Sequence, residues 1–190
     1  MGHSVIAYLA LLVLVALGRV AELFVSRRNQ RRLAARGAVK VPEKHFHWMV
    51  LMHSGVLLSA GLEVVLLARP FIAGLALAMS VLFVLANALR WWVIRTLAGQ
   101  WNVQVMDTTR LGVVTRGPFR WIRHPNYLAV CLELISLPLI HTAWLTALWA
   151  TLANAWVLRR RIAIEESVLL ADPLYREAMA SKSRFVPGLF

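Results

Sequence analysis

The hydrophobic positions of this chain are gathered into long runs, and the polar and basic positions fill the segments between them. A helix needs about 20 consecutive, mostly apolar residues to cross a bilayer. Three runs reach that length and predict membrane-spanning helices over residues 5–25, 48–68 and 71–89. The pattern therefore indicates an all-α integral membrane protein.

A fourth apolar region, residues 127–158, is long enough for two helices but is interrupted by Pro138. Proline removes a backbone donor and ends or kinks a helix. We therefore expect a helical hairpin of residues 127–140 and 143–158. This gives about five transmembrane helices in a single domain. Because the first arm is short, a re-entrant hairpin is an open alternative.

The composition supports a membrane protein. Of the 190 residues, 59% are hydrophobic and 16% are charged, and the mean hydropathy is +0.64. Soluble domains are about half apolar and about a quarter charged, so this balance excludes an ordinary soluble domain. The single cysteine, Cys131, leaves no internal disulfide, so helix packing must hold the fold together.

The net charge of +12 is distributed unevenly along the chain. Every Lys and Arg except Arg19 and Arg69 falls in the segments that follow the first, third or fifth predicted helix. Cytoplasmic loops are enriched in Lys and Arg, so we expect the N-terminus outside and the C-terminus in the cytoplasm. The expected partner is a lipid bilayer, the inner membrane of a bacterium. Nucleic acid is not expected, because that partner requires a soluble basic domain.

The segment RGPFRWIRHPNY, residues 116–127, places rigid and cationic residues between apolar runs. Its Gly-Pro and His-Pro pairs both interrupt helices, and Pro125 suits the first position of the helix that follows. The free N–H groups of residues 126–128 would then face the cytosol, where a helix N-terminus can receive a carboxylate or a phosphate. The alternative is an interfacial loop whose arginines bind lipid headgroups.

A second polar segment, RRRIAIEESVL, occupies residues 159–169 after the fifth predicted helix. Arg161 and Glu165 are four residues apart, so they share one helix face. They form either an ordinary surface ion pair or a site in which the arginine holds an anionic substrate and the glutamate holds hydroxyl groups or a cation.

Together, RGPFRWIRHPNYLAV and the later elements RIAIEESVL, LYREAM and SRFVPGLF resemble the isoprenylcysteine carboxyl methyltransferases and their bacterial relatives over residues 90–190. The elements stand in that family's order and spacing. The resemblance implies a membrane-embedded enzyme that uses S-adenosylmethionine, releases S-adenosylhomocysteine and has no Rossmann domain. It implies a cofactor region in residues 90–190 near the cytosol, and a substrate side in residues 1–89.

The same resemblance implies the residues of the site. Arg161 and Glu165 would be catalytic, with Arg161 on the substrate side. Phe119 stands where the family commonly has a tyrosine, so stacking would remain but a hydroxyl contact would be lost. No metal ligand is implied. The implied cofactor-binding residues are Gln104, Leu111, Val113, Val114, Phe119, His124, Pro125, Asn126, Tyr127, Glu165 and Glu166.

The N-terminal half bears on the acceptor. Arg19 and Glu22 lie within the first predicted helix, and ionisable residues inside a membrane are functional candidates. The stretches RVAELFVSRRNQRRLAARGAVK and HFHWMVLMH resemble a bacterial branch that accompanies type III polyketide synthases and methylates hydroxyls of long-chain alkylpyrones or alkylresorcinols. That resemblance implies a functional pairing with such a synthase. The implied acceptor site consists of Arg161, Glu22, Asn29, His45, His47 and His53.

The chemistry of the acceptor leaves alternatives open. A histidine or Glu22 would accept the proton of an enol or phenol, whereas a carboxylate acceptor needs no base. Arg19 and Glu22 could instead simply neutralise each other. A prenylcysteine carboxyl group is the second acceptor, although its prenylated source is unexpected in the GC-rich bacterium that the many Ala and Arg residues indicate. A phospholipid amine is a less favoured acceptor. The alternative that is not an enzyme is a non-catalytic, lipid-binding membrane protein.

Overall fold

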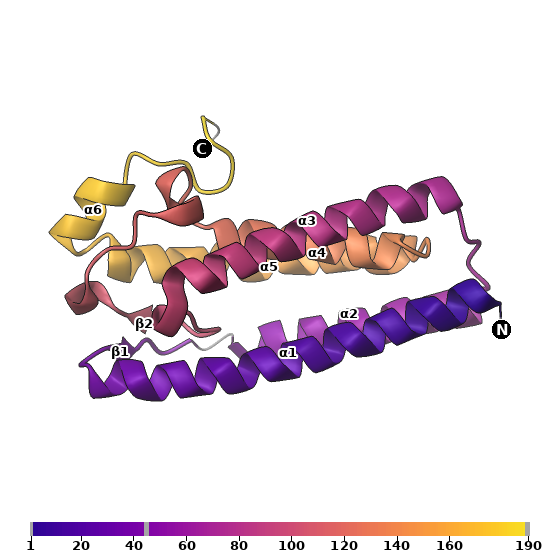
Figure 1. Ribbon diagram of the computed structural model, residues 1–190, viewed down its shortest axis with the longest axis horizontal. Coiled ribbons are helices and arrows are strands. Elements are labelled where there is room, and N and C mark those ends of the chain that lie inside the picture. Colours follow the sequence, from indigo (N-terminus) through magenta and orange to yellow (C-terminus); the bar gives the residue numbers. More distant parts are fainter. Residues whose placement is uncertain (1, 44–45, 189–190) are drawn as a thin grey trace.

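The computed structural model describes residues 2–43 and 46–188. Long helices run side by side, and the short elements gather at one end of them (Figure 1). The elements in chain order are α1 (His3–Ala35), β1 (Val39–Lys40), α2 (Phe46–Leu66), α3 (Ala73–Leu97), η1 (Ala98–Gln100), β2 (Met106–Asp107), η2 (Thr109–Leu111), η3 (Gly117–Arg120), α4 (Pro125–Leu139), α5 (Trp144–Leu169) and α6 (Pro173–Met179).

Among the described residues, three helices are long and apolar enough to cross a membrane: α1, α2 and the stretch Ala73–Gln100 that contains α3. They correspond to the first three predicted spans. The helical hairpin of α4 and α5 is also present. However, α4 has only 15 residues, and threonine, tryptophan and arginine residues interrupt the apolar run of α5. The structure therefore supports a helical membrane protein without confirming five spans.

The first helix is longer than predicted, because it continues past residue 25 to Ala35. On this extension Ser26, Asn29 and Leu33 are buried, while the basic residues between them are exposed. Ser26 Oγ accepts a hydrogen bond from the backbone N–H of Val103 at 2.9 Å. The extension is thus held by the loop after α3, a long-range contact that the hydrophobic pattern does not contain.

The hairpin helix α4 is the centre of the bundle. It packs between α3 and α5, while α2 packs against both α1 and α5. Nine of the 15 residues of α4 are buried. By contrast, Leu14 and Leu17 on α1 are 66% and 62% exposed, and apolar side chains on the outside of such a bundle suit contact with lipid. The bundle therefore has a packed centre and an apolar outer surface.

The end of the bundle that carries the hairpin turn is closed by Glu63 of α2. Its carboxylate accepts hydrogen bonds from the backbone N–H groups of Leu145 and Thr146, at 3.1 and 2.7 Å. These are free donors of the first turn of α5, so Glu63 acts as a helix cap supplied by another helix. Arg69 lies 2.7 Å from the same carboxylate and balances its charge.

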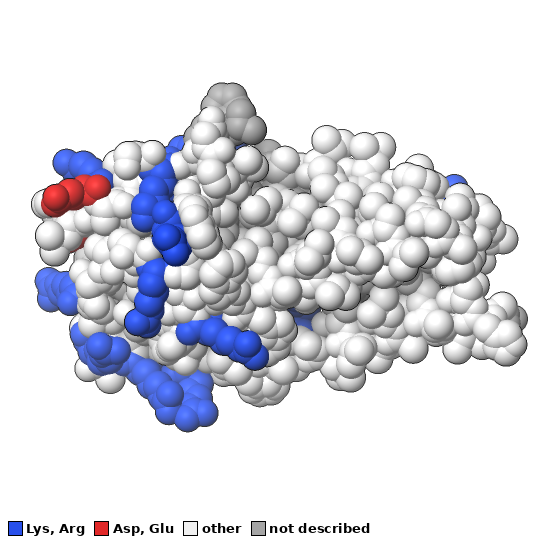
Figure 2. Space-filling model, turned by 45° about the horizontal axis from the view of Figure 1, so that its top comes forward, with Lys and Arg blue, Asp and Glu red and all other residues white. Residues whose placement is uncertain are grey.

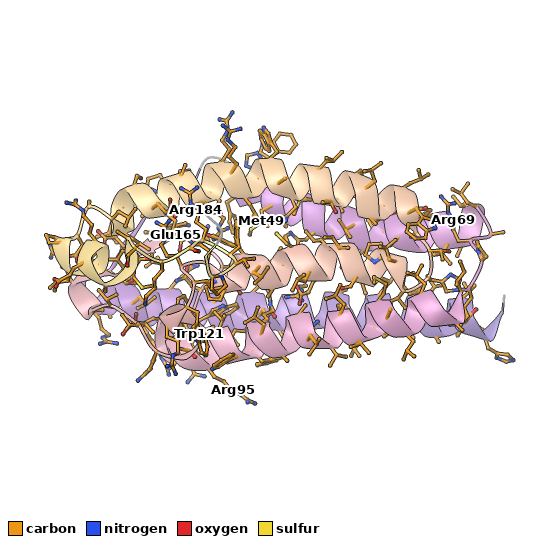
Figure 3. All side chains as sticks on the ribbon, turned by 90° about the horizontal axis from the view of Figure 1, so that it is seen from above. Met49, Arg69, Arg95, Trp121, Glu165 and Arg184 are labelled. Carbon is orange, nitrogen blue, oxygen red and sulfur yellow. The ribbon has the colours of Figure 1, made fainter. Side chains whose placement is uncertain are left out.

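Charged side chains separate along the bundle. Figure 2 shows most of the basic residues gathered over one end and a large surface with few charged atoms over the rest of the visible face. In Figure 3, Arg69 lies at the opposite end from Glu165 and Arg184. This separation is the one on which the predicted orientation depends, and the orientation itself stays a prediction.

Candidate functional site

A cavity of about 390 Å³ lies where the short elements meet the bundle. One part of its wall comes from the loop after α3, η3, the start of α4 and α6, another comes from α1, α2 and α3 within the bundle, and α5 contributes to both. The cavity therefore joins the polar end of the molecule to its apolar interior. A space of this size matches the lower range of small-molecule sites.

The segment around His124 forms one side of the cavity through its local backbone. His124 is the N-cap residue of α4 and Pro125 is its first residue, as the sequence predicted from the missing N–H of proline. The C-terminal tail holds this segment in place: the N–H of Arg123 donates to the carbonyl of Ser183 at 2.9 Å, and that of His124 to the carbonyl of Arg184 at 3.0 Å. The tail is therefore part of the wall that supports the site.

Glu166 fixes the same segment from α5. His124 Nε2 donates to its Oε1 at 3.0 Å, and Arg123 and Arg184 lie 3.2 and 2.6 Å from the carboxylate. Burial acts to raise the pKa of Glu166, but the hydrogen bonds from His124 and Arg184 and the charge of Arg123 outweigh it and lower that pKa to about 2. Glu166 does not line the cavity, so it supports Arg123 and His124 from behind and is not in the cavity wall as predicted.

Arg161, Tyr127 and Glu165 form a connected group on the cavity wall. Arg161 Nε donates to the Tyr127 hydroxyl at 2.8 Å, and that hydroxyl donates to Glu165. The predicted pairing of Arg161 with Glu165 is thus made through Tyr127. Arg161 also donates to the carbonyl of Val103 and lies 3.5 Å from Glu43. These partners compensate the buried arginine, whose exposure is only 7%.

Three residues that line the cavity each contain a buried polar atom with no hydrogen-bond partner within the part of the chain that the structure describes. The atoms are Trp101 Nε1, Arg123 Nε and Asn126 Oδ1. Buried polar atoms are normally paired, so each such exception requires an explanation. Two donors and one acceptor around one cavity fit a polar ligand with carboxylate, ammonium and hydroxyl groups, and S-adenosylmethionine carries all three.

An ionic quartet that consists of Arg19, Glu22, Arg90 and Glu133 lies beside the part of the cavity within the bundle, and all of its members except Glu133 line the cavity. Glu22 lies 2.8 Å from Arg19 and 2.6 Å from Arg90, and Glu133 lies 2.9 and 3.4 Å from the same two arginines. The sequence analysis identified Arg19 and Glu22 but missed Arg90 and Glu133. Glu133 could have been found, because it is the one acidic residue within the predicted span 127–140.

The other predicted residues fall into two groups. The first group lines the cavity and consists of Glu22, His53, Gln104, Val113, Val114, Phe119, His124, Pro125, Asn126, Tyr127, Arg161 and Glu165. The remaining ones do not: Asn29 donates to the carbonyl of Trp101 at 2.7 Å, Leu111 packs with Leu33 and Met106, and His47 is exposed beside Trp48. His45 lies outside the described residues.

Comparison with known proteins gives a consistent family. The model of the isoprenylcysteine carboxyl methyltransferase (ICMT) family matches residues 76–171. An uncharacterized protein of Bacillus subtilis strain 168, YpbQ, is 31% identical over 160 residues, which cover 84% of this chain and 94% of that protein. An uncharacterized protein of Haemophilus influenzae is 28% identical over 152 residues, covering 80% of this chain and 88% of that protein.

A solved structure also resembles this fold. It is described as the eukaryotic intramembrane Ras methyltransferase ICMT. The TM-score is 0.56 at 25% identity, and the match covers 72% of this chain and 50% of that one. This chain therefore corresponds to about half the length of the solved relative, whereas it matches most of the length of the two bacterial relatives.

Proposed function

Because the chain belongs to the isoprenylcysteine carboxyl methyltransferase family, a family of membrane methyltransferases, we propose that it transfers the methyl group of S-adenosylmethionine to a lipophilic acceptor. The observation that carries this proposal is a cavity whose wall includes both the residues of three unpartnered buried polar atoms and the apolar interior of the bundle. A polar cofactor and a lipid meet in such a space without either leaving its preferred surroundings.

The residues around the polar part suit the proposed cofactor. Arg123 Nε would donate to the cofactor carboxylate, and Asn126 Oδ1 would accept from its ammonium group. Glu165 would accept from ribose hydroxyls, while Phe119 and Val114 would contact the apolar faces. When bound, S-adenosylmethionine supplies an electrophilic methyl group on a sulfonium. The chain then mainly orients the reactants and excludes water, and orientation alone can contribute about 7–11 kcal/mol in favourable systems.

We assign the acceptor as a hydroxyl of a long-chain polyketide lipid, such as an alkylresorcinol or alkylpyrone. Charge balance supports a neutral acceptor. The two arginines of the ionic quartet are compensated by its two glutamates, and Arg161 is compensated by Glu43. Each of these arginines thus already has an anionic partner, so the cation left for a carboxylate acceptor would be the sulfonium of the cofactor. A type III polyketide synthase is the proposed source of such a lipid.

The second candidate is a prenylcysteine carboxyl acceptor. It is favoured by the name of the solved relative, a Ras methyltransferase and isoprenylcysteine carboxyl methyltransferase. A carboxylate would approach Arg161, which already lies in the cavity wall. The two candidates differ in their product, because the first gives an ether and the second gives a methyl ester.

The test supplies labelled S-adenosylmethionine to membranes that contain the protein, together with an alkylresorcinol, an alkylpyrone or a farnesylcysteine analogue. We expect label in the lipid phase that alkali does not release. Release as methanol would replace the hydroxyl acceptor with the carboxyl acceptor. If no acceptor is labelled and S-adenosylhomocysteine does not bind, the chain is a non-catalytic lipid-binding protein and the proposal is wrong. Membranes with Arg161→Leu are the inactive control, and Glu177→Gln on the exposed face of α6 is the matched active one.

A further inference from the structure

His53 lies on the cavity side of α2, among the residues that line the cavity within the bundle. Met49 precedes it by four residues on the same helix and lines the same cavity, so the two share one helix face. Met49 Sδ lies 2.9 Å from Arg161 Nη1. His53 is therefore one turn, about 5.4 Å, further into the bundle than the contact with Arg161. In Figure 3, Met49 lies near Glu165 and far from Arg69.

The hydrogen bond of His53 determines which ring nitrogen is free. Nδ1 lies 2.8 Å from the carbonyl oxygen of Met49. A carbonyl oxygen can only accept, so in the neutral ring Nδ1 carries the proton and Nε2 carries the lone pair. Nε2 has no hydrogen-bond partner in residues 2–43 and 46–188. An unprotonated ring nitrogen is thus available beside the bundle part of the cavity.

The other candidate bases are occupied or lie elsewhere. Both carboxylate oxygens of Glu22 accept hydrogen bonds from the two arginines of the ionic quartet, at 2.6–3.0 Å. A carboxylate held by two guanidinium groups is a poor proton acceptor. Glu165 already accepts from the tyrosine hydroxyl beside it. His47 is exposed, its ring lies tilted against that of Trp48, and it does not line the cavity.

Arginines from three other helices act electrostatically on His53: Arg19 of α1, Arg90 of α3 and Arg161 of α5. Their positive charges favour the neutral ring, so His53 holds a free lone pair before the acceptor arrives. The first two arginines are balanced within the ionic quartet, and Arg161 faces Glu43. His53 is therefore the uncommitted base of this region, and its surroundings do not supply a free cation for an anionic acceptor.

We propose that His53 is the general base of methyl transfer and that it selects acceptors with a neutral, weakly acidic hydroxyl group. This inference rests on the proposed function. The acceptor oxygen forms a bond to the methyl carbon while the carbon–sulfur bond breaks with its electron pair passing to sulfur. The hydroxyl proton passes to Nε2 of His53, which becomes an imidazolium and later releases the proton to water. An acceptor that is already ionised requires no such step.

Two substitutions separate the base from the fold. His53→Phe removes both nitrogens and retains a ring. His53→Asn supplies an amide donor at about the position of Nδ1, so the contact with the Met49 carbonyl can persist without a basic nitrogen. The matched control is His3→Phe, because His3 is exposed at the opposite end of the bundle. Thermal unfolding in detergent identifies any variant that does not fold.

The first readout compares two lipid acceptors of equal chain length, a phenol and a carboxylate. We expect both His53 variants to lower kcat/KM for the phenol by about 10²–10⁴-fold, the range that general base catalysis covers. For any methylation of the carboxylate, the variants should stay within about threefold of the parent protein. Binding of S-adenosylhomocysteine should not change.

The second readout needs no cofactor. A long-chain alkyl nitrophenol absorbs at longer wavelength when its hydroxyl is ionised, so its spectrum in the cavity reports proton transfer to the protein. With His53 present, we expect the phenolate band of the bound probe to appear at a lower pH than in either His53 variant. With His53→Phe or His53→Asn, the bound probe should keep the band of the neutral phenol, while the His3→Phe control should behave like the parent.

The outcomes distinguish this inference from the proposed function. If the parent methylates the phenol and both folded His53 variants do so equally well, the assignment of His53 as the general base is wrong. The proposed hydroxyl acceptor is then still supported. If the parent methylates only the carboxylate, the proposed hydroxyl acceptor is wrong, and the assignment of His53 as its general base is wrong as well. An identical probe spectrum in the parent and both variants would also overturn the assignment of His53.

Discussion

The ionic quartet gives a quantitative prediction, which concerns Glu133→Gln. The substitution keeps the size of the side chain but removes the charge that faces Arg19 and Arg90, at 2.9 and 3.4 Å. The side chains of Arg90 and Glu133 are only 7% and 9% exposed. Removing one partner of a buried ion pair costs about 3–5 kcal/mol, because the remaining charge loses its compensation. Glu22 still faces both arginines, so we expect a loss near the lower limit, about 3 kcal/mol.

The assay is reversible unfolding in mixed micelles with increasing dodecyl sulfate, followed by the fluorescence of the eight tryptophans. Arg90→Met alone should also be strongly destabilising, whereas the double variant with Glu133→Gln should lose less than the sum of the two, because charge balance is restored. Glu177→Gln, an exposed acidic residue on α6, should stay within about 0.5 kcal/mol of the parent. An equal free energy of unfolding for Glu133→Gln and Glu177→Gln would refute the reasoning, since it would mean that water already solvates the quartet.

Three further predictions concern the segment that supports the cofactor site. Gly117→Ala should cost about 1–3 kcal/mol and weaken binding of S-adenosylhomocysteine in calorimetry, because the residue has φ +59° and an added Cβ would lie 2.3 Å from Thr96 Oγ1. The pKa of Glu166 is lowered to about 2 from the ordinary 4.5, so its contribution to stability is full above about pH 4.5 and is lost as the pH falls towards 2; the protection of the His124 amide against exchange, relative to its intrinsic exchange rate, should fall over that window. Tyr127→Phe loses a hydrogen-bonded hydroxyl and should weaken S-adenosylhomocysteine binding about tenfold, the equivalent of about 1.4 kcal/mol.

Each of these has a control. Gly74→Ala places its Cβ where nothing lies within 4 Å, and it should bind S-adenosylhomocysteine normally; equal weakening by both alanines would rule out the clash at Gly117. Glu166→Gln should remove the acid dependence of exchange protection at the His124 amide. If that dependence persists in the variant, another titrating group causes it. Unchanged affinity for Tyr127→Phe would exclude the tyrosine hydroxyl from positioning the cofactor site.

Much of the fold is predictable because it depends on local patterns. Runs of apolar residues predict the first three helices, and Pro138 together with the following polar residues predicts a hairpin. Pro125 predicts the start of α4 to the residue. The errors concern helix ends: α1 and α3 continue to Ala35 and Leu97, beyond their apolar runs. Tertiary contacts with the loop after α3 decide those ends, and hydropathy does not record them.

The candidate site also contains residues that the sequence indicates and others that only the structure brings together. The segment around His124 and the pair Arg161 and Glu165 could be identified from the sequence, because neighbours along the chain or on one helix face stay together. Arg90 and Glu133 could not be joined to Glu22 in the same way, since they come from three different helices. The occupied state of Glu22 and the free Nε2 of His53 likewise depend on side-chain geometry. The structure was therefore needed to identify which candidate base is available.

The anchoring of the cofactor segment by the tail has a consequence for biosynthesis. Ser183 and Arg184 accept the backbone hydrogen bonds of Arg123 and His124 but follow them by sixty residues. At a synthesis rate of about 5–20 residues per second, the ribosome needs about 3–12 s to make the intervening chain. During that interval the first helices can already occupy the membrane while the cofactor wall lacks its support. A nascent chain would then place its lipid-facing part in the membrane before the segment around His124 is anchored, so under the proposed function it could bind its cofactor only after the tail has been made.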